Sequence, residues 1–282
     1  MPATQRWRLD LAYDGNAFHG FAYQPEYTTV VGVLRATLAQ TLHMAVEPTI
    51  VGAGRTDAGV HAFAQVVHVD LPTRLFAKDR GPDPERLMMS LNKQLRGRIR
   101  VLAARAVSGD FHARFSAQWR EYRYLVLEMT PPALGLTNAW SWTVEGPLDV
   151  DAMNASCALI VGTHDFHAFC RRPANSASDQ PLRRRVISAT WERLEDEWAM
   201  SPTHSPAVRF NVRAQSFCHN MVRSLTSTMV AIGQGRLAPD ELRARLESGI
   251  RDHLPSPAPA GGLSLIGVGY DAFAGGPSGF VR

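Results

Sequence analysis

The chain has 282 residues, 45% of them hydrophobic, and 30 lysines and arginines against 26 acidic residues leave a net charge of +4. This composition indicates a soluble globular protein with one large domain or two of ordinary size. No apolar run approaches the roughly 20 residues of a membrane helix, and the first residues lack the apolar centre of a secretory signal. We therefore expect no membrane contact and a cytoplasmic location.

The N-terminal part alternates strand and helix patterns. Residues 7–14, "WRLDLAYD", show the two-residue period of a half-buried strand. Residues 28–43 then repeat aliphatic side chains every four positions behind the capping candidates Thr28 and Thr29, which predicts a helix. A strand rich in β-formers should begin at Ala62.

A second helix is predicted in "DPERLMMSLNKQLR", with Asp83 as its cap and Pro84 in its first turn. The other predicted elements are strands at 99–107, 122–129, about 186–200, 208–217 and 263–270, and helices at 150–160 and 219–233. We expect an α+β fold of two ferredoxin-like halves, residues 1–110 and 111–282, which share a mixed, mainly antiparallel sheet with helices on one face.

The cysteines and histidines give weak signals. Cys157, Cys170 and Cys218 form an odd set without close spacing, which predicts no disulfide framework and a reducing compartment. His164, His167 and Cys170 stand three residues apart and raise the question of a zinc site. No second ligand cluster of matching spacing accompanies them, so we expect no metal.

Arginines gather in two stretches of the sequence. The first is "LRGRIR", with Arg96, Arg98 and Arg100, and the second is "RRPANSASDQPLRRR", with Arg171, Arg172, Arg183, Arg184 and Arg185. Such clusters suit a phosphate backbone, although each taken alone is equally typical of a solvated loop.

One stretch, "GAGRTDAGVHAFAQVVHVD" at 52–70, sets Asp57 between Arg55 and His61 among several glycines. A surface turn would use the same residue types. This loop, however, leads directly into a predicted buried strand, and loops anchored on a rigid sheet often carry catalytic residues.

Several motifs together resemble the tRNA pseudouridine synthases of the TruA type over nearly the whole chain. The motifs are "AYDGNAFHGF", "GAGRTDAGVHAFAQVVH", "DFHARFSAQWREYRY", "GTHDFHAFC", "FCHNMVRSL" and "APAGGLSLIGVGY". The Arg-Thr-Asp-Ala-Gly-Val-His run is the most specific of them. The chain departs from the family at Phe21 and Ala22, where Trp and Gln are usual, and at Val31, where Gln is usual.

The resemblance implies an isomerase that converts uridine to pseudouridine at positions 38 to 40 of the tRNA anticodon arm. It implies two ferredoxin-like halves, a homodimer, tRNA as the partner, and no cofactor. The isomerisation needs neither redox change nor phosphate energy, and the sequence contains no nucleotide-binding motif.

The resemblance also implies roles for individual residues. Asp57 is the essential carboxylate, acting either as a nucleophile at C1′ or as the base that removes the 2′ hydrogen. Arg223 is its basic partner, Tyr122 stacks on the uracil and takes part in catalysis, and Arg55 engages the tRNA. Leu263 or Leu265 packs beside the uracil. Further tRNA contacts are Phe111, His112, Ala113, Arg114 and Phe115, and Ala168, Phe169, Cys170, Arg171 and Arg172.

Two other functions are compatible with parts of the sequence. A non-catalytic tRNA-binding or RNA-remodelling protein of the same fold would not require Asp57. A carboxylate-based hydrolase would ordinarily use a second acidic group, and the 52–70 loop has none before its strand begins.

Overall fold

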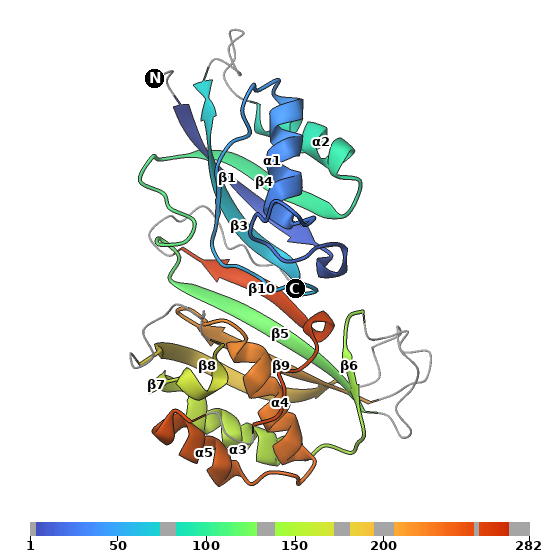
Figure 1. The fold of residues 1–282 in the computed structure, drawn as a ribbon, viewed down its shortest axis with the longest axis vertical. Helices are drawn as coiled ribbons and strands as arrows, with labels where there is room; N and C mark the ends of the chain where they lie inside the picture. Colours follow the sequence, from blue (N-terminus) through green and yellow to red (C-terminus); the bar gives the residue numbers. More distant parts are fainter. Residues whose placement is uncertain are drawn as a thin grey trace. The chain divides into compact units, whose positions relative to one another are not determined.

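The computed structural model describes residues 4–73, 83–128, 139–171, 181–194, 206–250 and 254–270. They belong to two compact units (Figure 1): the first unit is Met1–Arg120 with Leu265–Arg282, and the second unit is Glu121–Ser264. The sequence-based division after residue 110 stays a prediction. In the structure, the residues from Leu265 onward join the first unit, although they lie at the far end of the sequence.

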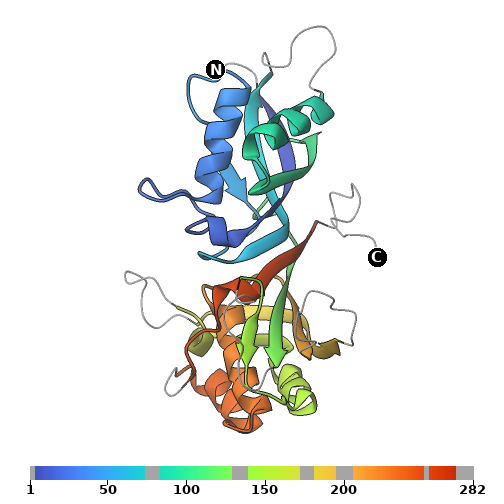
Figure 2. The same cartoon turned by 90° about the vertical axis from the view of Figure 1, so that its right-hand side faces the viewer.

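The first unit is built on a long central strand. Strand β1 (Thr4–Tyr13) pairs antiparallel with β3 (His61–Pro72) on one side and with β4 (Ile99–Val107) on the other. Strands β2 (Ile50–Gly52) and β10 (Leu263–Gly269) also pair with β3. Helices α1 (Val30–Thr41) and α2 (Pro84–Leu95) lie next to each other on one side of the strands (Figures 1 and 2).

The helix boundaries in the first unit follow from the predicted caps. The Thr29 hydroxyl accepts the Gly32 N–H at the start of α1, and the Asp83 carboxylate accepts the Glu85 and Arg86 N–H groups at the start of α2. These bonds satisfy amides that have no partner inside the helix. Thr28, the other capping candidate, lies outside the helix.

The second unit has the strand order β5 (Trp119–Glu128), β9 (Ala207–Ala214), β8 (Arg183–Leu194), β7 (Gly162–Asp165), and β6 (Trp142–Val144) pairs with β5. Its helices are α3 (Val150–Ile160), α4 (Met221–Gly233) and α5 (Pro239–Ser248). The α+β class expected from the sequence is confirmed.

Helix α5 is absent from the sequence-based prediction, although its sequence contains start and stop signals. Pro239 occupies the first turn together with Asp240 and Glu241, and Gly249 adopts a left-handed conformation (φ +67°) just past the end. Only Leu242 and Leu246 are buried. The apolar stripe is therefore too narrow to reveal the helix by periodicity.

Two of the three cysteines correct the sequence-based expectation. Cys170 and Cys218 form a disulfide in this structure, with their Cα atoms 5.8 Å apart and a separation of 48 positions in sequence. Sequence spacing does not reveal such a pair, because the chain returns to Cys170 only after strands β8 and β9. Cys157 remains a free, buried thiol, and burial raises its pKa to about 12.

No helix within the described residues is long and apolar enough to cross a membrane.

Candidate active site

Asp57 lies in the loop that joins β2 to β3 in the first unit, and its side chain is half-buried. The Val60 N–H donates to the Asp57 carbonyl oxygen (3.1 Å), which closes a turn directly after the carboxylate residue. The preceding residue, Thr56, is anchored twice: its carbonyl accepts the Phe21 N–H (3.0 Å), and its hydroxyl contacts the Tyr13 hydroxyl (2.7 Å). The backbone at Asp57 is thus held by a neighbouring loop and by β1.

Two glycines allow this close approach. Gly20 has φ +97°, and a Cβ atom there would lie 3.2 Å from the Thr56 carbonyl oxygen. A Cβ on Gly52 would overlap the ring of Phe21. Phe21 is one of the departures from the family pattern. Its buried ring packs against Gly52 at the end of β2, directly before the Asp57 loop.

Buried polar side chains hold the first part of the same loop. Gln65 donates to the Gly54 carbonyl (3.0 Å). Arg120, only 8% exposed, donates to the carbonyl oxygens of Ala53 (2.9 Å), Arg114 (2.6 Å) and Ala117 (3.0 Å). A buried guanidinium that satisfies three carbonyls connects the Asp57 loop to the segment after β4.

Sequence reasoning missed Arg120 as a functional residue. A signal was available, because Arg120, Tyr122 and Tyr124 alternate along β5 and all three are buried. A cation on the buried face of a strand requires hydrogen-bond acceptors, and this requirement points to nearby carbonyl groups.

His61, the basic residue that follows Asp57 in the loop sequence, lies in the core of the first unit. Its ring is completely buried, and its Nδ1 atom accepts the Gly15 N–H (3.1 Å) and lies 3.2 Å from a carboxylate oxygen of Asp14. Arg55, in contrast, is exposed. Of the two basic neighbours of Asp57 in sequence, only Arg55 is therefore on the surface of the loop.

The predicted tRNA-contact segment 111–115 divides into core and surface residues. Phe111 and Ala113 are buried, His112 is half-buried, Arg114 is exposed, and Phe115 is 76% exposed. The His112 ring accepts the backbone N–H groups of Arg114 and Phe115, which fixes the turn that presents them. Of the five residues, only Arg114 and Phe115 are exposed at the surface.

His68 supports the same segment from β3. Its Nδ1 atom accepts the Ala113 N–H (3.0 Å), and its ring lies 4.8 Å from the ring of His112. Burial, followed by the charges of Arg6 and His112, lowers the pKa of His68 to about 4. The ring is therefore neutral near pH 7 and serves as an acceptor.

In the second unit, the two predicted catalytic residues lie on regular elements. Tyr122 is on β5, 7% exposed, with its ring edge-on to Phe217 (5.1 Å between centroids). Arg223 is in the first turn of α4 and is half-buried. Its Nε atom donates to the Ala258 carbonyl (2.6 Å) and one terminal nitrogen donates to the Asn220 side chain (3.3 Å). The Ala258 N–H in turn donates to the Arg223 carbonyl (3.1 Å).

The remaining predicted contact residues are mostly buried. Leu263 is 5% exposed at the start of β10, and Leu265 is fully buried. Ala168, Phe169 and Cys170 are buried as well, so Arg171 is the exposed part of that segment. Arg172 lies outside the described residues.

The other arginine cluster begins strand β8. Arg183, Arg184 and Arg185 pair in register with Asp165, His164 and Thr163 of β7. Within the described ranges, no three His, Cys, Asp or Glu residues gather closely enough to hold a metal ion.

Known proteins resemble this chain over nearly its full length. The sequence model of the family described as tRNA pseudouridine synthase matches residues 11–116 and 157–271. A protein named tRNA pseudouridine synthase A from Jannaschia sp. (strain CCS1) is 37% identical over 267 residues, covering 94% of this chain and 95% of the relative. A protein of the same name from Caulobacter sp. (strain K31) is 39% identical over 272 residues, covering 94% of this chain and 98% of the relative.

The chain therefore belongs to the tRNA pseudouridine synthase family. Its enzyme class is isomerase, and its reaction is the conversion of uridine in tRNA to pseudouridine.

Proposed function

We propose that the protein modifies uridines at positions 38 to 40 of the tRNA anticodon arm, as a cytoplasmic homodimer without a cofactor, with Asp57 as the essential carboxylate. The observation that carries the proposal is the intact Arg-Thr-Asp-Ala-Gly-Val-His loop, whose backbone is anchored on both sides of Asp57. A carboxylate in a loop that is anchored on a sheet suits covalent or general-base chemistry at a ribose.

The reaction conserves atoms and electrons. The N1–C1′ bond breaks, the uracil turns, and a bond forms between C5 and C1′. The hydrogen on C5 leaves as a proton, and N1 gains one. Asp57 attacks C1′ in one route and removes the 2′ hydrogen in the other, and neither route needs an oxidant.

The other site residues have distinct tasks in this proposal. Taking a base out of its stack costs a few kcal/mol, and one aromatic contact returns about 1–3 kcal/mol. The Tyr122 ring supplies this contact, and its hydroxyl assists proton transfer at C5. Arg223 acts as the basic partner of the carboxylate, Arg55 holds the displaced backbone, and Leu263 packs beside the uracil.

The alternative is an RNA-binding or RNA-remodelling protein of this fold that performs no chemistry. Substituting Asp57→Asn separates the two functions. We expect it to abolish tritium release from tRNA labelled at C5 of uridine, while tRNA affinity stays within about tenfold, or about 1.4 kcal/mol.

Asp151→Asn is the matched control, because Asp151 is an exposed aspartate in the first turn of α3. It should retain the parental rate. A parental rate in Asp57→Asn would contradict the assignment, and the absence of release from the unchanged protein would favour the alternative. Mapping the product by position tests sites 38 to 40, and sedimentation of the unchanged protein tests the dimer.

A further inference from the structure

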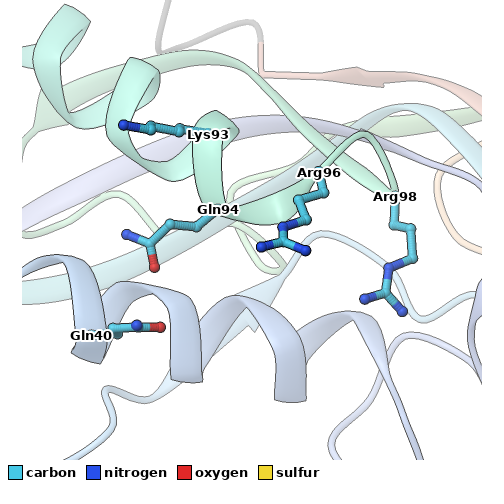
Figure 3. A pocket seen from close by; sticks show the side chains of 5 residues that line it. All are labelled: Gln40, Lys93, Gln94, Arg96 and Arg98. Atoms are coloured by element: carbon cyan, nitrogen blue, oxygen red, sulfur yellow. The ribbon is translucent and has the colours of Figure 1, made fainter.

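The first unit has a basic pocket that is lined by none of the residues to which a role in the reaction was assigned above. Its volume is about 600 Å³, and it is lined by Gln40, Lys93, Gln94, Arg96 and Arg98. These residues come from the last turns of α1 and α2 and from the turn that leads into β4 (Figure 3). The guanidinium groups of Arg96 and Arg98 both extend toward α1 (Figure 3).

The turn that presents the two arginines is firmly anchored. Leu95 and Ile99, on either side of it, are almost completely buried, and the Arg98 N–H donates to the Leu95 carbonyl (3.3 Å). Arg96 itself has φ +50°, in the left-handed region where a glycine or an asparagine is the usual residue. The left-handed backbone conformation is unfavourable for an arginine. Residues held in such strained conformations cluster at functional sites.

The pocket is positively charged and lined without a carboxylate. Among the described residues, no ion pair engages the side chains of Lys93, Arg96 or Arg98, whereas Arg6 and Arg8 on β1 pair with Asp70 and Asp10. The attraction of a helix C-terminus for cations explains Lys93 and Arg96. It does not explain Arg98, which lies past the helix end, or the hollow between the side chains.

A short series of contacts leads from the pocket to the Asp57 loop. The carbonyl of Arg98 accepts the Asp14 N–H (3.3 Å), and the Asp14 carboxylate lies 3.2 Å from the ring of His61. His61 begins β3 at the point where the Asp57 loop ends. The pocket and the Asp57 loop are therefore connected through direct contacts within the first unit.

We propose that this pocket binds phosphate groups of the RNA backbone and anchors the substrate outside the reacting nucleotide; the proposal rests on the proposed function. The cations neutralise phosphates. The Gln40 amide donates to phosphate oxygens, as does the second N–H of the Gln94 amide, whose nitrogen also donates to the Thr41 hydroxyl (2.7 Å). Contacts of this kind position the RNA and carry no sequence information.

The double variant Arg96→Gln, Arg98→Gln tests the pocket. The salt slope is the change in the logarithm of the tRNA association constant per unit change in the logarithm of salt concentration. Each lost phosphate contact should reduce its magnitude by about one, so we expect a reduction of about two in this variant. Between 50 and 200 mM salt, the unchanged protein should then lose about 16-fold more affinity than the variant. Single-turnover tritium release at saturating tRNA should stay near the parental rate.

The matched control is Arg86→Gln, Arg243→Gln, which removes two exposed arginines, one from the first turn of α2 and one from the middle of α5. Its slope should stay close to that of the unchanged protein. An unchanged slope in the pocket variant would overturn the proposal, as would equal changes in pocket and control variants. A third outcome would also overturn the proposal: the unchanged protein binds inorganic pyrophosphate at micromolar concentration, the pocket variant does not, and the tRNA salt slope is the same in both. The pocket would then be a site for a small anion. The proposed function fails separately, if the unchanged protein releases no tritium.

Discussion

The two units support their predicted site residues in different ways. In the first unit, Asp57 lies in an irregular loop whose carbonyl groups are held by the side chains of Gln65 and Arg120 and by a neighbouring loop. In the second unit, Tyr122 and Arg223 lie on a strand and a helix, where the regular backbone sets their position. An irregular loop depends on buried polar groups contributed by distant strands. Substitutions far from Asp57 should therefore disturb the first unit's site, whereas changes in the second unit should act locally.

The largest expected effect concerns Tyr122. Tyr122→Phe retains the ring and removes the hydroxyl, and Tyr122→Leu removes the stacking surface. If the hydroxyl takes part in proton transfer, as we expect, the Phe variant should lose about 10²–10⁴-fold in single-turnover rate. If the ring serves only as a platform, Phe should cost little and Leu about ten- to a hundredfold. A near-parental rate for Tyr122→Phe would leave Tyr122 as a platform alone.

The second prediction concerns Arg120, the buried cation of the first unit. Arg120→Met leaves three carbonyl groups without their donor, and each such group costs about 1–3 kcal/mol when it stays buried. After partial relaxation we expect a loss of about 3 kcal/mol in the free energy of unfolding, measured by chemical denaturation. Arg123→Met, at an exposed position three residues along β5, should change it by about 0.5 kcal/mol at most. Equal losses in the free energy of unfolding in the two variants would show that the hydrogen bonds of Arg120 do not stabilise the Asp57 loop.

The third prediction tests the bond between Tyr13 and Thr56. The Tyr13 hydroxyl is buried, which raises its pKa to about 12, and it contacts Thr56 and Gln65. Tyr13→Phe should destabilise the protein by about 1–2 kcal/mol, because two buried polar groups lose a partner. Tyr23→Phe, at a half-exposed ring, should be close to neutral. A neutral Tyr13→Phe variant would mean that the loop does not depend on this bond.

The smallest expected effect is a pH dependence from His68. Its pKa is about 4 in the folded protein and about 6.5 in an unfolded chain, so the unfolded state binds the proton more readily. Stability from the neutral ring is fully present above pH 6.5 and decreases as the pH falls toward 4. Between pH 6.5 and pH 5 we expect a loss of about 1–2 kcal/mol that His68→Asn, which keeps an acceptor for Ala113, should remove. Parallel pH profiles for the two proteins would contradict the assignment.

Local signals predicted much of the fold. Helices α2 and α3 begin and end within a residue or two of their predicted limits, because a cap residue and a clear apolar stripe mark them. Helix α5 and the short strands β2, β6 and β7 were not predicted. Strands of three or four residues are too short to show a period, and pairing with a neighbour defines them.

The sequence by itself determined helices α1 to α4, the long strands and the loop around Asp57, because these depend on residues close together in the chain. Only the tertiary structure decided that His61 is buried, that Arg120 supports the Asp57 loop, and that Cys170 meets Cys218. It also decided that Arg96 and Arg98 of "LRGRIR" line a pocket to which α1 contributes Gln40. Each of these contacts joins segments that are separated in sequence, and their meeting depends on how the intervening strands and helices pack together.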